Sequence, residues 1–110
     1  MRVPTNLFEP LTLPCGAILK NRIAKSAMSD SLGDGTGHPT QEQMRLYQRW
    51  AEGGVAVSIV GEVQGTGAYA EKPGNLVLNE GSDLERFRAL ARQGGQNDTL
   101  LWLQLGHAGA

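Results

Sequence analysis

Four polar residues stand where apolar runs of this sequence end: Ser29, Glu62, Gln104 and His107. Apolar runs of this length, bounded by turn residues, predict β-strands. In a parallel sheet the C-terminal strand ends meet at one rim, and α/β proteins bind their ligands there. Glycines beside Glu62 and His107 would permit a close approach of the backbone. The pattern therefore favours a planar or polar ligand across that rim, with ordinary loop polarity as the alternative.

Other kinds of site have weaker support. Residues 33–37 read Gly-Asp-Gly-Thr-Gly, but they lack the third glycine and the adjoining helix of a dinucleotide fingerprint, and the sequence has no Gly-Lys-Ser/Thr of a P-loop. His107 has no second histidine or carboxylate at ligand spacing, so no metal is expected. The single cysteine, Cys15, cannot form an internal disulfide and is expected to be a turn or core residue.

Length and composition indicate one globular domain. The 110 residues are 40% apolar and 19% charged, and we expect one unit over residues 1–110 without an internal boundary. Ten basic and eleven acidic side chains are interspersed, so the charge favours neither nucleic acid nor an anionic membrane as a partner. No apolar run could span a bilayer and the start lacks a signal peptide's apolar middle, so a cytoplasmic location is expected.

Strands and helices are expected to alternate along the chain. Long loops rich in glycine follow the first two long strands, the second loop covering residues 64–81. The returns from helix to strand are short and are marked by Gly53-Gly54 and Gly94-Gly95. The expected strands are a hairpin at 11–13 and 17–19, followed by 22–27, 55–60 and 99–105.

Two capping boxes predict the helices between these strands. Thr40 with Gln43 opens a helix over residues 41–52, and Ser82 with Glu85 opens the second helix. The expected apolar faces are Met44, Tyr47, Trp50 and Ala51 on the first helix and Leu84, Phe87, Leu90 and Ala91 on the second. A solvated face of the second helix is expected to carry Arg86, Arg88 and Arg92.

This order of elements predicts a parallel sheet with helical crossovers. Either an open doubly wound sheet or the start of a barrel has such an order. Long loops after strands and short returns after helices are typical of (β/α)₈ barrels, which place their working loops on one face. An open sheet with one working face would show the same asymmetry.

Four stretches together resemble the opening of Old Yellow Enzyme family proteins. Residues 7–11 and 19–23 look like the family's N-terminal hairpin and first strand, and Ser-Ala-Met-Ser at 26–29 stands where the family has a flavin-contacting tetrad. Residues 47–54 resemble the helix end that leads into the second strand, and 104–109 resemble the third-strand signature. Departures are Ala27 where proline is common, Ser29 where cysteine or threonine is common, and Ala110 where arginine is common.

The resemblance implies the first three βα units of a (β/α)₈ TIM barrel, preceded by an N-terminal β-hairpin. It implies FMN at the C-terminal rim, reduced by NAD(P)H and reoxidised by an activated alkene or related electrophile, as in an ene-reductase. Backbone at Ala27 and Met28 should lie along the isoalloxazine ring, and Ser29 should stand near its C4 carbonyl and N5. Gln104 should meet the pyrimidine edge, and Glu62 should contribute through its backbone.

A barrel of this class takes on the order of 250 residues. We therefore expect the catalytic residues beyond Ala110, and we expect the remaining barrel segment or self-association to complete the domain around a small-molecule substrate. The alternative is a truncated, non-catalytic half-barrel that acts as a binding or assembly module.

Overall fold

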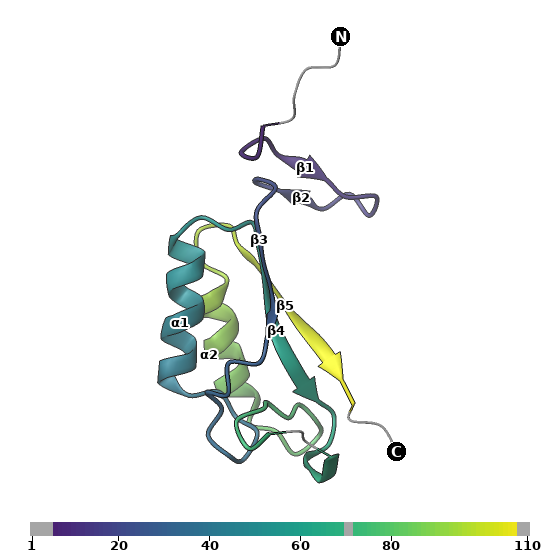
Figure 1. The fold of residues 1–110 in the computed structure, drawn as a ribbon, viewed down its shortest axis with the longest axis vertical. Coiled ribbons are helices and arrows are strands. Elements are labelled where there is room, and N and C mark those ends of the chain that lie inside the picture. The colour runs from purple at the N-terminus through teal and green to yellow at the C-terminus, as the bar shows by residue number, and fades with distance from the viewer. Residues whose placement is uncertain (1–5, 70–71, 108–110) are drawn as a thin grey trace.

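A computed structural model describes residues 6–69 and 72–107. Three parallel strands form a sheet in the order β3-β4-β5, and a separate hairpin, β1-β2, lies beyond the N-terminal end of β3 (Figure 1). Both helices lie against the same face of the sheet (Figure 1). The elements are β1 Leu11–Thr12, β2 Ile18–Leu19, β3 Ala24–Met28, α1 Gln41–Glu52, β4 Val57–Gln64, a 3₁₀ turn Gly67–Tyr69, α2 Leu84–Gly94 and β5 Leu100–Gly106.

The predicted hairpin and first helix are confirmed. Leu11 pairs with Leu19 across the hairpin, whose turn contains Gly16 at a φ of 93° and the exposed Cys15. Helix α1 has the predicted bounds because the Thr40 hydroxyl accepts a hydrogen bond from the Gln43 backbone N–H at 3.2 Å. Its buried residues include Met44, Tyr47 and Ala51, as the spacing predicts.

The second helix begins one residue later than the sequence pattern indicates. Asp83, not Ser82, is the N-cap, and its carboxylate accepts from the Glu85 N–H at 3.1 Å. The Ser82 hydroxyl instead donates to the Val77 carbonyl oxygen at 3.0 Å, within the preceding loop. A carboxylate and a hydroxyl cap equally well, so only the loop geometry decides between neighbouring candidates.

The buried face of α2 is narrower than predicted. Phe87 and Leu90 are buried, whereas Leu84 is 50% exposed. The Arg86 side chain is 39% exposed, and its guanidinium also donates to Asp34 at 2.8 Å and to the Pro39 carbonyl oxygen at 2.6 Å. These bonds attach α2 to the loop that follows β3, a long-range contact that helical periodicity does not report.

The central strand is longer than predicted and carries a bulge. β4 continues to Gln64, and its register with β5 shifts between Val60 and Val63. Glu62, in the bulge, has a φ of 56°. The sequence places the end of this strand near Val60 because Gly61 interrupts the apolar run. The extra residue allows Val60 and Val63 to face the helices together.

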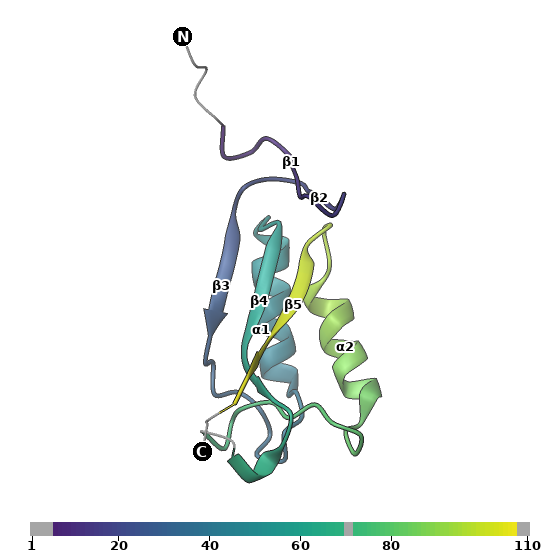
Figure 2. The same cartoon turned by 90° about the vertical axis from the view of Figure 1, so that its right-hand side faces the viewer.

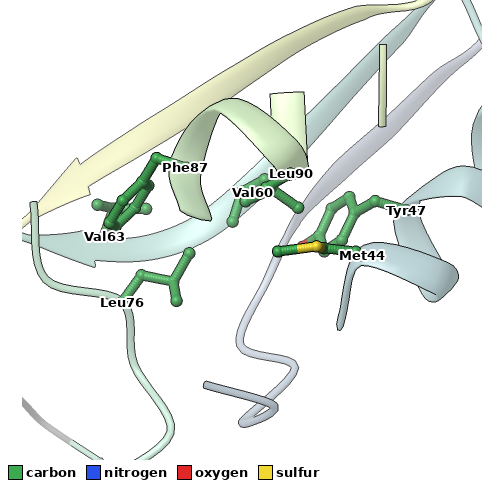
Figure 3. Close-up of a cluster of buried hydrophobic side chains, with 7 residues drawn as sticks. All are labelled: Met44, Tyr47, Val60, Val63, Leu76, Phe87 and Leu90. Carbon is green, nitrogen blue, oxygen red and sulfur yellow. The ribbon is translucent and has the colours of Figure 1, made fainter. Parts of the chain in front are cut away.

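The core lies between the sheet and the two helices (Figure 3). Seven buried side chains form it, and the loop after β4 contributes one of them. They are Met44 and Tyr47 of α1, Val60 and Val63 of β4, Leu76 of the loop, and Phe87 and Leu90 of α2 (Figure 3). Burying apolar surface of this kind is the main favourable contribution to folding.

The other face of the sheet is open (Figure 2). Along β5 exposed and partly buried residues alternate, so that Leu101 and Leu103 pack on the core while Trp102 is 44% exposed. On β3, Lys25 contacts the α1 aromatic residues, whereas Met28 is 48% exposed.

Among the described residues the chain holds two complete βα units and the strand of a third, rather than three complete units. Consecutive strands that pair in parallel, with both helices on one face, are the arrangement of successive units in a barrel. One half of a doubly wound sheet has the same arrangement. The α/β class with a preceding hairpin is confirmed.

Gly61 permits the close approach of β3 and β4, and this contact gives a first prediction. A Cβ at Gly61 would lie 2.5 Å from the Met28 carbonyl oxygen and 2.6 Å from its nitrogen. Gly61→Ala should therefore lower the free energy of unfolding by about 1–3 kcal/mol, measured by urea denaturation. Gly65→Ala is the matched control, because a Cβ there meets nothing within 4 Å. Equal stability of the two variants would contradict this account of the strand contact.

Candidate functional site

The C-terminal ends of the three parallel strands bring together most of the residues singled out in the sequence. Ala27 and Met28 close β3, Ser29 follows it, and Glu62 and Gln104 lie in the last residues of β4 and β5. Met28 pairs with Val60, after a register shift between Lys25 and Met28. Because β4 continues to Gln64, Glu62 lies inside a strand rather than just beyond one. The five residues form one continuous rim, which we call the strand-end rim.

Gly61 determines how closely β3 and β4 approach each other at the rim. The Met28 backbone lies so close to Gly61 that no side chain fits between them. Ala27 is half-buried, and the Met28 side chain stands on the open face of the sheet. The backbones of β3 and β4 are therefore in direct contact at the rim.

Glu62 and Gln104 are joined by a hydrogen bond. The Glu62 backbone N–H donates to the Gln104 side-chain oxygen at 3.3 Å across the β4–β5 pair. The Glu62 carboxylate turns to the loop after β4 and accepts from the Asn75 amide at 3.3 Å. The Gln104 side chain is exposed, and because its oxygen accepts from Glu62, its amide N–H groups are oriented to donate to a ligand.

Ser29 has an orphaned hydroxyl. Its Oγ is buried and has no hydrogen-bond partner among the described residues, a condition shared with Ser58 Oγ and Gln43 Oε1. Leaving a buried polar group unpaired costs about 1–3 kcal/mol. At a strand end such a group is a candidate to bind a ligand.

Sequence patterns missed a polar cluster just behind the rim, between β3 and α1. The Asp30 carboxylate accepts from the Tyr47 hydroxyl at 2.9 Å and from the Gln43 amide at 3.1 Å. Lys25 Nζ lies 4.8 Å from the ring centres of both Tyr47 and Trp50 and donates to the Ile59 carbonyl oxygen. Polar residues at inward positions of β3 and α1 were the signal that could have indicated it.

Burial and charge shift the titration of this cluster. Burial raises the pKa of the Tyr47 hydroxyl far above its usual range, and the Asp30 carboxylate raises it further. Burial lowers the pKa of Lys25, and the charge of Asp30 partly opposes that effect. A raised pKa keeps the Tyr47 hydroxyl protonated near neutral pH, in agreement with its hydrogen bond to Asp30.

Loops after β3 and β4 contact each other beside the rim. The Gly33 N–H donates to the Gly74 carbonyl oxygen at 2.9 Å, and His38 Nε2 accepts from the Asp83 N–H at 2.9 Å. Burial acts to raise the pKa of Asp34, but hydrogen bonds from Thr36, the His38 backbone and Arg86 outweigh it and hold the pKa well below its usual range. A cavity of about 450 Å³ opens between the loops and includes Thr36, Lys72 and Asn75.

Among the described residues, the remaining candidate, His107, is not part of a second binding or metal site. His107 lies exposed just after β5. Within residues 6–69 and 72–107, no group of three or more His, Cys, Asp or Glu side chains could hold a metal ion. In the same ranges no helix has the length and apolar character needed to cross a membrane.

Comparison with known proteins identifies the family. The family model described as NADH:flavin oxidoreductase / NADH oxidase family matches residues 6–110. The chain is 32% identical to the NADH-dependent flavin oxidoreductase iliE of Hypocrea jecorina over 91% of its length, and 31% identical to the iliE protein of a Neonectria species over 92%. It spans only 26% and 14% of these two relatives, respectively.

The fold likeness extends to solved structures. The Old Yellow Enzyme of a Pichia species superposes with a TM-score of 0.81 at 17% identity, covering 94% of this chain and 26% of that one. At this identity the likeness concerns the fold alone, which is that of the barrel enzymes of the Old Yellow Enzyme type. The chain belongs to the NADH:flavin oxidoreductase / NADH oxidase family, that of the Old Yellow Enzymes, and corresponds to its N-terminal portion.

Proposed function

We propose that this chain supplies the first part of the FMN site of an NAD(P)H-dependent oxidoreductase with a (β/α)₈ barrel. The observation that carries the proposal is the strand-end rim, where the backbone of Met28 on β3 and the amide of Gln104 on β5 flank the end of the central strand β4. Family membership supports flavin as the cofactor, and the curated relatives are NADH-dependent by name. Reduction of activated alkenes or related electrophiles is the reaction that we propose for the whole protein.

The rim fits one side of a flavin in shape and in chemistry. The Met28 and Gly61 backbones pack so closely that no side chain stands between β3 and β4 at the rim, which favours a flat ligand such as an isoalloxazine ring. The Gln104 amide can donate to a carbonyl of the pyrimidine edge, and the orphaned Ser29 hydroxyl can donate near N5 and the C4 carbonyl. FMN, when bound, supplies hydride transfer.

The protein's own residues orient the ring and tune it. The Glu62 N–H holds the Gln104 oxygen, which fixes the direction of the amide donors. A donor from Ser29 would stabilise negative charge on the reduced ring and so favour reduction. The exposed Met28 and Trp102 side chains provide apolar surface on the same open face, which would exclude water from beneath the ring.

Residues that bind and protonate the substrate are not found on this rim. We propose that they come from outside these 110 residues, together with the loops that bind the flavin phosphate. The relatives, of which this chain spans at most about a quarter, have ample length to provide them. A small-molecule substrate and a cytoplasmic location belong to the same proposal.

Gln104→Leu tests the cofactor assignment in the FMN-binding protein. Loss of the amide should leave the polar ring edge unpaired at a cost of about 1–3 kcal/mol, which raises the Kd for FMN roughly 5- to 150-fold. Flavin-fluorescence titration measures this change. Gln96→Leu is the matched control, because Gln96 is exposed in the turn between α2 and β5, away from the rim. A Kd within about twofold of wild type for Gln104→Leu would refute the assignment.

Ser29→Ala tests the tuning role. Removing the donor should lower the two-electron reduction potential of bound FMN by about 20–60 mV, corresponding to roughly 1–3 kcal/mol. Potentiometric titration gives the value. Ser58→Ala is a close control, since its hydroxyl is also buried and unpartnered but lies in the N-terminal part of β4. If both variants keep the wild-type potential, Ser29 is only a turn residue.

A further inference from the structure

We propose that Asp30 is a positioning residue for Ser29: α1 holds the Asp30 carboxylate through Tyr47 and Gln43, and this fixes the backbone from which the Ser29 hydroxyl approaches the flavin. The inference rests on the proposed flavin function. It adds a residue to the redox site that does not itself contact the ring.

The Asp30 carboxylate accepts several hydrogen bonds, although it lies in a loop. Its Oδ2 accepts from the Tyr47 hydroxyl at 2.9 Å, and both carboxylate oxygens lie 3.1 Å from the Gln43 amide nitrogen. Its Oδ1 also accepts from the Leu32 N–H at 2.9 Å, which closes an Asx turn. Three donors from two segments therefore determine where Asp30 lies.

The donors themselves are rigid. Gln43 and Tyr47 are 1% and 0% exposed, and they lie one turn apart on α1. The Tyr47 ring packs edge-on against Trp50 with 5.2 Å between ring centroids, and its hydroxyl lies 3.4 Å from Lys25 Nζ. Lys25 in turn donates to the β4 carbonyl of Ile59, so the cluster joins α1 to the sheet.

Ser29 lies between two fixed neighbours. On one side, Met28 is pressed against Gly61 of β4. On the other side, Asp30 is held by α1, and Ser31 follows in the left-handed region with a φ of 56°. The backbone of Ser29 has little freedom between these points, so rotation about χ1 is the remaining motion of its hydroxyl. Preorganised donors of this kind act on developing charge without reorganisation.

A simpler explanation is that Asp30 has only a structural role and stabilises the packing of α1 on the sheet. A third explanation is that the negative charge of Asp30 acts directly on the flavin. The three explanations differ in sign and in their dependence on Ser29. Loss of positioning should lower the reduction potential, as is expected for Ser29→Ala. Loss of a nearby negative charge should raise the potential, because the reduced flavin gains negative charge. Loss of a structural pin alone should lower thermal stability without moving the potential.

The test is a double-mutant cycle on the FMN-loaded protein, with Asp30→Asn, Ser29→Ala and the combined variant. Asparagine keeps the shape of Asp30 but turns one acceptor into a donor that opposes the Gln43 amide or the Tyr47 hydroxyl. We expect Asp30→Asn to lower the potential by at least about half of the Ser29→Ala shift, and to add nothing in the Ser29→Ala background. Glu42→Gln is the matched control, because it removes an exposed carboxylate beside Gln43 and should leave the potential unchanged.

Tyr47→Phe is the second variant if Asp30→Asn fails to fold. It removes one donor to Asp30 and keeps the ring, and we expect a smaller fall in potential that again disappears without the Ser29 hydroxyl. A rise in potential of equal size in both backgrounds, or no change while Ser29→Ala still shifts the potential, would overturn the positioning role and leave the flavin function intact. Absence of FMN binding, or no effect of Ser29→Ala, would overturn the proposed role of Ser29 and this inference with it.

Discussion

The bulge in the central strand is the constraint on which the core and the rim both depend. By adding one residue between Val60 and Val63, it allows both valines to pack against the helices. The same residue, Glu62, takes a left-handed conformation and directs its N–H at Gln104. Gly61, beside it, admits the Met28 backbone. A bulge next to a site is a common means of redirecting a strand, and here it shifts the end of β4 relative to β5, while a second irregularity between Lys25 and Met28 shifts β3 relative to β4.

The two faces of the sheet have different roles. One face is closed by α1 and α2, which bury the apolar core (Figure 3). The opposite face exposes Met28, Leu100 and Trp102, and it ends at the strand-end rim (Figure 2). An apolar face of this extent needs a covering layer, and the relatives with this fold extend well beyond the length that this chain spans. The closed face contains the buried core, and the open face ends at the rim that we propose as the flavin site.

Polar groups link these faces. Tyr47 of α1 contacts both Lys25 of β3 and Asp30, and Asp30 directly follows Ser29 at the rim. Buried polar groups are tolerated when each has a partner, and the Asp30 carboxylate has three donors. The hydrogen bonds that pack α1 on the sheet and those that orient the rim residues therefore belong to one network. A substitution that alters the packing of α1 should also alter the orientation of the rim residues.

The sequence by itself determined the local elements and the family. The Thr40 cap and the spacing of Met44 and Tyr47 specify α1, and apolar runs specify three strands, because these signals act over a few residues. Features that depend on contacts between segments far apart in the sequence were decided only by the tertiary structure. Asp83 rather than Ser82 caps α2, Arg86 bonds to the loop after β3, and β4 continues through a bulge at Glu62. Sequence patterns also did not indicate the hydrogen bond between Glu62 and Gln104 or the one between Tyr47 and Asp30. Each joins residues that come into contact only when strands and helices pack.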